Sequence, residues 1–185
     1  GYLFMDWKIL FTDINFIIIQ IVGALAWLFL YLSYHRKTTN KILIFQIIAN
    51  ILFIIHYFCL GAYTGLAICF VEIIFDYLYY KTNDDKLLFK VSVPLRILCG
   101  VLTYGGPIDI LPIVASINDG YALTFRKKKL VRGAIITYVL WFIYDLSTLS
   151  ISGAITDAII VITNVCILLF NFNIFKTFKK IKKKL

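Results

Sequence analysis

Long apolar stretches separated by short polar connections run along the whole chain. A helix needs about 20 mostly apolar residues to cross a bilayer, so the pattern predicts a bundle of seven membrane-spanning helices. We expect them at Ile14–Tyr34, Ile42–Leu60, Ala62–Tyr80, Leu87–Tyr104, Pro107–Phe125, Val131–Leu149 and Ser152–Phe175. Only Gly105-Gly106-Pro107 separates the fourth stretch from the fifth, and six spans with one re-entrant segment are therefore the alternative.

Basic residues occur in every second connection. The segments HRKTTNK, KTNDDK and RKKKLVR and the C-terminal tail hold nearly all Lys and Arg, whereas the connections around Gly61, Gly105-Gly106 and Ser147–Ser152 hold none. Seven spans place every basic segment on one side of the membrane, and six do not. Because basic loops face the cytoplasm, we expect seven spans with the N-terminus outside and the C-terminus inside.

Composition supports an all-α integral membrane protein. The chain is 61% hydrophobic and 16% charged, against about 45–50% and 25% in soluble domains. A net charge of +9 is also typical of nucleic-acid-binding proteins. Here the cations sit beside apolar spans, where they contact anionic lipid headgroups at about 1 kcal/mol each. We therefore expect the lipid bilayer as a partner and no nucleic acid.

The arrangement of helix, basic loop, helix, neutral turn and helix occurs twice. A shift of 88 positions aligns Leu52 with Leu140 and Gly65 with Gly153. Because one helix lies between the two triplets, both run in the same direction across the membrane, as in parallel transporter repeats. The predicted organisation is an outer N-terminal segment (1–13), a first triple-helix bundle (14–80), a linker helix (87–104), a second triple-helix bundle (107–175) and a basic cytoplasmic tail (176–185).

Each triplet contains a helical hairpin with one notable pair of positions. Trp141 and Asp157 lie sixteen residues apart on two apolar arms joined by an uncharged turn, and Phe53 and Cys69 have the same spacing in the first triplet. An Asp near the centre of a bilayer costs about 2.5–3.5 kcal/mol. Asp157 is therefore expected to face the interior of the bundle.

The segments QIVGALAWLFL, HYFCLGAYTG and WFIYDLSTLSISGAITD resemble those of YgjV-type bacterial inner-membrane proteins, within the SWEET and semiSWEET (PQ-loop, MtN3-like) transporter superfamily. This resemblance implies a 3+1+3 helix plan and a facilitator for a small polar solute. SWEET-type carriers have an aromatic residue on the second helix of a repeat and an Asn sixteen residues later. Trp141 and Phe53 match the aromatic residue, while Asp157 and Cys69 replace the Asn. The nicotinamide riboside carriers of the PnuC type are more distantly similar.

The candidate substrate-binding residues come from both triplets: Trp141, Asp157, Asn164, Phe53, Cys69, Glu72 and Asn50. Glu72 and Asp76 share a helix face, and two ionised carboxylates so close repel one another. Both are therefore candidates for proton-linked transport. For Asp76, a position near the cytoplasmic end beside Lys81 or water is the favoured alternative.

Arg96 lies within a predicted span and needs an anionic partner. The sequence leaves four acids open as that partner: Glu72, Asp109, Asp119 and Asp145. A structural ion pair is the favoured role. The cysteines lack metal-site or disulfide spacing, and no nucleotide loop or catalytic triad order occurs. We therefore expect no enzyme, metal or cofactor.

A small polar solute is the expected ligand. The alternative functions are a membrane interaction or assembly protein without transport activity, and a PnuC-like vitamin or nucleoside carrier. The expected location is the bacterial inner membrane, in a multi-pass arrangement, and the question of a homo-oligomer stays open.

Overall fold

The computed structural model describes residues 13–34, 36, 38–82, 84–125 and 130–170. Within this part of the chain it contains seven α-helices and no strand. They are α2 (Ile14–Tyr34), α3 (Thr39–Leu60), α4 (Tyr63–Thr82), α5 (Asp85–Leu102), α6 (Ile110–Phe125), α7 (Leu130–Ser147) and α8 (Ile151–Phe170), and a short 3-10 turn, η1 (Pro107–Asp109), precedes α6.

The prediction of an all-helical protein with seven helices is confirmed. Helix α2 has the predicted bounds, and the other helices begin or end within a few residues of the predicted ones. Residues 1–12 of the N-terminal segment, residues 171–175 of the last predicted span and the basic tail 176–185 lie outside the described residues.

Among the described residues, four helices are long and apolar enough to cross a membrane: α2, α3, α4 and α8. Helix α6 has only 16 residues, and α5 carries Lys86, Lys90 and Arg96 within its 18 residues. Large apolar side chains such as Ile18, Phe58 and Ile155 are more than half exposed on the outside of the bundle. Such a surface is suited to contact with lipid rather than water.

The break between α5 and α6 has a clear local cause. Asp109 accepts hydrogen bonds from the backbone N–H groups of Gly105 (2.8 Å) and Gly106 (2.9 Å). Pro107 then begins η1, where its missing N–H costs no helical hydrogen bond. This cap separates two helices that the apolar pattern alone barely distinguishes.

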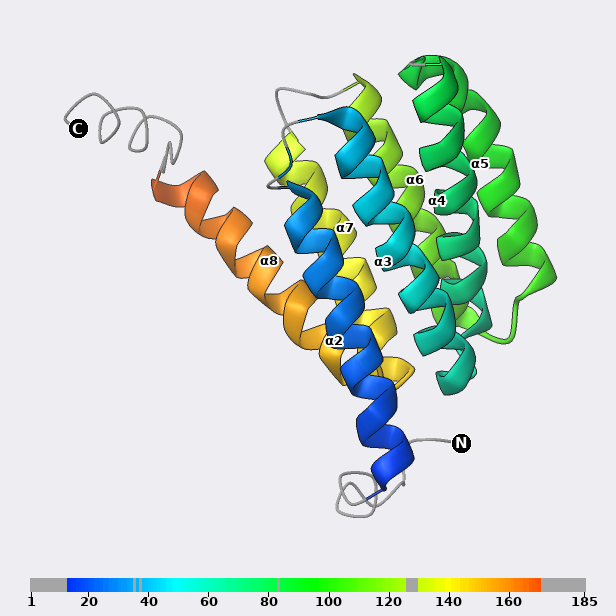
Figure 1. The fold of residues 1–185 in the computed structure, drawn as a ribbon, viewed down its shortest axis with the longest axis vertical. Helices are drawn as coiled ribbons and strands as arrows, with labels where there is room; N and C mark the ends of the chain where they lie inside the picture. The colour runs from blue at the N-terminus through cyan, green and yellow to red at the C-terminus, as the bar shows by residue number, and fades with distance from the viewer. Residues whose placement is uncertain (1–12, 35, 37, 83, 126–129, 171–185) are drawn as a thin grey trace.

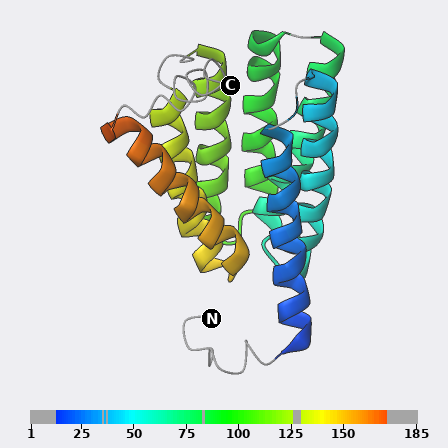
Figure 2. The same ribbon diagram turned by 60° about the vertical axis from the view of Figure 1, so that its left-hand side comes forward.

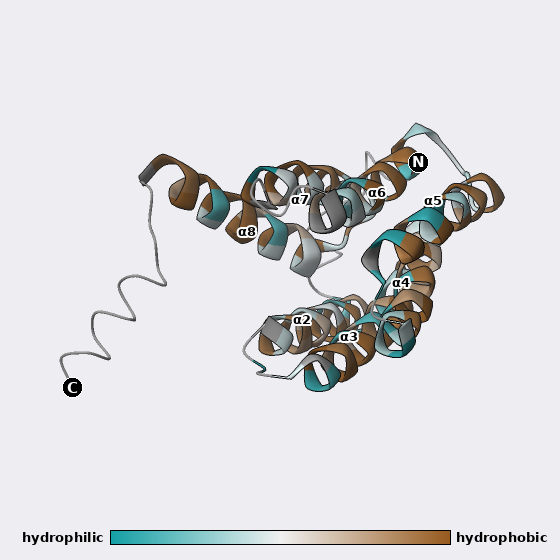
Figure 3. Cartoon of the chain, turned by 90° about the horizontal axis from the view of Figure 1, so that it is seen from above, coloured by the Kyte–Doolittle hydropathy of each residue, from teal (hydrophilic) through white to brown (hydrophobic). Residues whose placement is uncertain are grey.

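The helices form two rows. Seen end-on, α2, α3 and α4 make one row and α6, α7 and α8 the other (Figure 3). Helix α5 packs against α4 and α6, where the rows meet, and α2 contacts α8. Consecutive helices run in opposite directions, so α3, α5 and α7 all begin at the end where α2, α4 and α6 finish (Figure 1).

Helices α2 and α8 are close only near one end of the molecule. They approach one another where α8 begins and diverge toward the C-terminal end of α8, as both side views show (Figures 1 and 2). The end at which they meet carries the uncharged turns α3–α4, α5–η1 and α7–α8. On the side of α2 and α8, the rows are therefore joined at that end and diverge toward the other.

Candidate functional site

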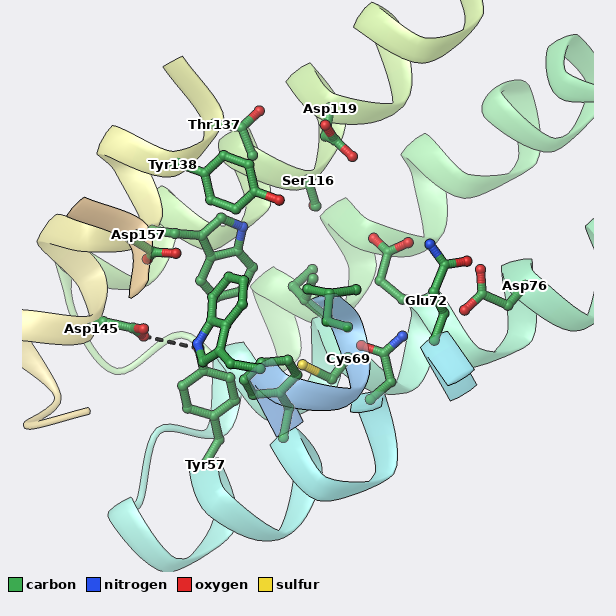
Figure 4. Close-up of a pocket in the computed structure, with 17 residues that line it drawn as sticks. Tyr57, Cys69, Glu72, Asp76, Ser116, Asp119, Thr137, Tyr138, Asp145 and Asp157 are labelled. Carbon is green, nitrogen blue, oxygen red and sulfur yellow. Dashed lines mark hydrogen bonds between the residues drawn. The ribbon is translucent and has the colours of Figure 1, made fainter. Parts of the chain in front are cut away.

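A cavity of about 180 Å³ lies between the two rows of helices. It is lined from α2, α3 and α4 on one side and from α6, α7 and α8 on the other (Figure 4). The lining residues are Trp27, Leu30, Gln46, Asn50, Phe53, Tyr57, Ile68, Cys69, Glu72, Asp76, Ser116, Asp119, Thr137, Tyr138, Trp141, Asp145 and Asp157. Helix α5 contributes none of them.

Most of the residues singled out in the sequence line this one cavity. They are Trp141, Asp157, Phe53, Cys69, Glu72, Asn50 and Asp76. Asn164 does not reach it, because its side-chain amide donates to the Ile160 carbonyl of its own helix (2.9 Å). Asp76 lies beside Asn50 in the cavity wall rather than at Lys81.

Aromatic rings form one wall of the cavity. Trp141 and Tyr57 stack with centroids 6.1 Å apart and planes 18° from parallel. Trp27 meets Phe53 edge-to-face at 5.4 Å, and its buried Nε1 has no hydrogen-bond partner in the described part of the chain. Rings from α2, α3 and α7 therefore present both flat faces and an unused donor to the same space.

Two carboxyl groups lie close to these rings. Asp145 accepts a hydrogen bond from the Tyr57 hydroxyl at 2.9 Å and has Ser150 as a second neighbour. Asp157 is fully buried, and neither of its oxygens has a hydrogen-bond partner among the residues that the structure describes. Since an unpaired buried polar group is costly, Asp157 is the group most in need of a ligand.

Glu72 and Arg96 form a salt bridge with a distance of 2.7 Å. Arg96 is almost fully buried behind the cavity wall, donates to the Ser92 hydroxyl (2.7 Å) and lies over the Phe75 ring. The partner of Arg96 is therefore Glu72. Of the other three acids left open by the sequence, Asp109 caps the η1 turn, whereas Asp119 and Asp145 line the cavity.

Polar contacts join the two rows of helices at the end with uncharged turns, which we call the closed end. Gln20 of α2 donates to the Leu149 carbonyl (2.8 Å) and accepts from the Ser152 N–H (3.0 Å). The two ring nitrogens of His56 contact the Ile19 carbonyl (2.8 Å) and the Ser150 hydroxyl (2.9 Å). These bonds join α2 and α3 to the turn between α7 and α8.

Two glycines allow close packing at this closed end. A Cβ on Gly65 would come within 2.9 Å of the Tyr144 ring, whose hydroxyl accepts the Gly65 N–H. A Cβ on Gly153 would overlap the Asp145 carboxyl. Gly65 and Gly153 are the glycines aligned by the shift of 88 positions, and both lie where a side chain would displace a neighbour from the opposite hairpin arm or row.

Five lining residues were not predicted as substrate-binding: Trp27, Tyr57, Tyr138, and Asp119 and Asp145, which the sequence suggested only as partners of Arg96. The shift of 88 positions was a usable signal for three of them, Tyr57, Tyr138 and Asp145. It pairs Tyr57 with Asp145, which are hydrogen-bonded, and Asn50 with Tyr138, which both line the cavity. For Trp27 and Asp119 the chain offers no equivalent signal.

No three His, Cys, Asp or Glu side chains in the described part of the chain are placed to share a metal ion. All four cysteines are free thiols, and Cys69 is the one that lines the cavity. The site is therefore one of aromatic rings, carboxyls, amides and hydroxyls.

Comparison with protein families identifies the family of this chain. The Imp-YgjV model, described as a bacterial inner membrane protein, matches residues 17–173. The chain belongs to this family. The match covers α3–α8 and α2 from residue 17 onward, so the residues that line the cavity and those at the closed end lie within it. Comparisons with curated proteins and with solved structures found no match.

Membership in the Imp-YgjV family gives the location a firm basis. The family is one of bacterial inner membrane proteins, and the four long apolar helices agree with that. The predicted YgjV-type relationship is confirmed. The family description names neither a solute nor the SWEET superfamily. The transported solute and the wider SWEET relationship therefore stay predictions.

Proposed function

We propose that this protein is a multi-pass transporter of a small polar solute, with a SWEET-like plan of two triple-helix bundles joined by α5. The observation that carries the proposal is the cavity between the two rows of helices. All its lining residues come from α2–α4 and α6–α8. A carrier needs a central site between two bodies that move against each other, and an assembly protein needs none.

Positions related by the shift of 88 support the two-bundle plan. Four such pairs contribute both members to the cavity: Asn50 and Tyr138, Phe53 and Trp141, Tyr57 and Asp145, and Cys69 and Asp157. Tyr57 and Asp145 are hydrogen-bonded to each other across the gap between the rows. Equivalent positions that face a shared space are expected of repeats related by an axis along the membrane normal.

The closed end supports alternating access. Gln20 and His56 tie the rows together at the end with uncharged turns, whereas α2 and α8 diverge toward the other end (Figure 2). In our proposal the basic loops face the cytoplasm. The conformation is then closed to the outside, and rocking of the bundles opens it.

Proton coupling, if it is part of transport, is assigned to Asp76 and Asp157 rather than to Glu72. Glu72 is held by Arg96, and removing its charge would leave a buried cation unpaired. Asp157 has no such partner and lies within the cavity lining.

The proposal is tested with the purified protein in liposomes. Solute-dependent swelling measured for sugars, polyols, amino acids, nucleosides and amines is expected to show selective flux. Trp141→Ala removes a large aromatic face and should reduce that flux by about tenfold, the equivalent of 1.4 kcal/mol.

Two cysteine variants provide the matched control for the cavity. A protein that retains only Cys69, which lines the cavity, should react with a small water-soluble thiol reagent and lose flux. A protein that retains only Cys166, which is exposed on the outside of α8, should keep its flux. Absence of flux for the whole panel, with Cys69 unreactive, contradicts the proposal.

A further inference from the structure

The cavity carries many acidic groups and no basic one. Five lining residues are acidic, namely Glu72, Asp76, Asp119, Asp145 and Asp157, and none of the described lining residues is Lys, Arg or His. We propose that the transported solute is a small organic cation with an ammonium group. This inference rests on the proposed transport function and names its substrate class.

Most carboxyl groups of the cavity wall have no salt-bridge partner in the described part of the chain. Arg96 balances Glu72, in the one salt bridge found in the described part of the chain. Asp119 also interacts with the charge of Arg96, which it shares with Glu72. Asp76, Asp145 and Asp157 have no salt-bridge partner in that part of the chain. Bringing carboxylates into a low-dielectric interior is costly unless a counter-charge accompanies them. A cationic solute supplies that counter-charge while it is bound.

Asp157 marks the point where the cation binds. Its side chain is fully buried in the cavity lining, and neither oxygen has a hydrogen-bond partner among the described residues. Asp145, beside the same rings, already accepts from Tyr57. An ammonium N–H of the solute would give Asp157 a charge-assisted hydrogen bond, which is stronger than a neutral one.

The aromatic wall fits the same ligand. Trp141 and Tyr57 are stacked with their planes 18° apart, and Trp27 and Tyr138 lie nearby with ring centroids 6.2 Å from each other. Cations are attracted to ring faces within about 6 Å, and cages of such rings bind quaternary ammonium groups. A neutral sugar would use the amides and hydroxyls of the wall but would leave the carboxyls without a counter-charge.

The volume limits the solute to a small one. A cavity of about 180 Å³ has room for several waters, since one water needs about 10–15 Å³ by the same measure. Choline and ethanolamine are small enough for such a space. We therefore choose choline and ethanolamine as probes.

The test compares each cation with an uncharged molecule of the same shape. Thermal unfolding of the full-length protein in detergent is followed with choline against its carbon isostere, and with ethanolamine against ethylene glycol. A ligand that binds the folded state raises the unfolding temperature. We expect the cations to bind at least about tenfold more tightly than their neutral counterparts. Asp157→Asn should remove that preference, and Asp84→Asn, which keeps the α5 cap outside the cavity, should not.

Each outcome decides the matter. Neutral probes that bind as well as the cations, no binding of either cation, or an unchanged preference in folded Asp157→Asn would each overturn the inference. If Asp157→Asn fails to fold, the comparison of charged and neutral probes in the native protein still decides. If neutral solutes cross the liposome membrane but no cation binds, the protein is a transporter and the inference of a cationic solute is wrong. If cations bind selectively but no solute crosses, the cation site is supported and the proposed transport function is wrong.

Discussion

At the scale of single residues, the cavity contains two kinds of carboxyl group. Glu72 has a fixed partner in Arg96, while Asp157 has none among the described residues. A charge with an internal partner mainly holds helices together, and a charge without one is available to a ligand. The two acids are therefore expected to respond differently to the loss of charge.

Glu72→Gln is predicted to destabilise the protein. Breaking a fully buried ion pair costs about 3–5 kcal/mol, but the Glu72 side chain is 33% exposed. A loss of about 1.5–3 kcal/mol, typical of a hydrogen bond to a charged group, is therefore expected. Thermal unfolding in detergent measures it, with Asp157→Asn as the matched loss of a cavity carboxyl, which should not destabilise.

A double variant separates the effect of the unpaired Arg96 charge from the effect of changed packing. Arg96→Met in the Glu72→Gln background removes the unpaired cation and should recover part of the lost stability. If the Glu72→Gln protein has the same unfolding temperature as the native protein, the salt bridge between Arg96 and Glu72 does not stabilise the fold. The structural role assigned to this pair is then wrong.

The sequence predicts which residues gather in the cavity better than it predicts their contacts. The spacing of sixteen residues brought Trp141, Asp157, Phe53 and Cys69 to one space. It could not choose among four acids for Arg96, because the rotation of each helix about its axis depends on packing against its neighbours. Partners on other helices are decided by that rotation.

At the scale of helices, α8 explains why Asn164 lies elsewhere. Residues seven apart share a helix face, so Asn164 was expected beside Asp157. Seven residues also span about 10 Å along the helix axis. Helix α8 diverges from α2 in that direction (Figure 1). Asn164 is therefore carried past the cavity, and its amide binds within α8. The tilt of α8 is not encoded in any local pattern.

The junction of α2 with the α7–α8 turn is predicted to control access from the closed end. Gln20→Leu keeps the bulk of the side chain but removes two hydrogen bonds, each worth about 1 kcal/mol. A protein that retains only Cys69 should then react about tenfold faster with a reagent added on the side of the uncharged turns. Asn164→Leu removes an amide that bonds only within α8 and should leave the rate unchanged.

Leu149 adds to the case for that junction. It is the one described non-glycine residue with a positive φ, 61°, a conformation that bulky residues rarely adopt. Its carbonyl accepts from Gln20. Equal reactivity of Cys69 in the Gln20→Leu protein and in its parent would show that the bonds of Gln20 do not hold this end closed.

At the scale of the whole molecule, one chain encloses the cavity. Both rows of helices come from the same polypeptide, and six of its helices contribute to the lining. A second copy is not needed to complete the site, whatever assembly forms in the membrane. The function can therefore be tested on the protein as a monomer or as an oligomer.

The last prediction concerns which way the closed end faces. Seven spans with the basic loops inside place the uncharged turns outside, so an impermeant maleimide should label Ser147→Cys in intact cells. Lys86→Cys, at the opposite end of the bundle, should be labelled only after the membrane is opened. Both side chains are exposed in the structure, so burial does not bias the comparison.

Orientation and closure together give a sharper expectation for the cavity. Because Gln20 and His56 close the end assigned to the outside, Cys69 should react from the cytoplasmic side and be protected from outside in this conformation. Labelling of Lys86→Cys but not Ser147→Cys in intact cells would reverse the orientation. The end closed by Gln20 and His56 would then face the cytoplasm, and the structure would be that of a carrier open to the outside.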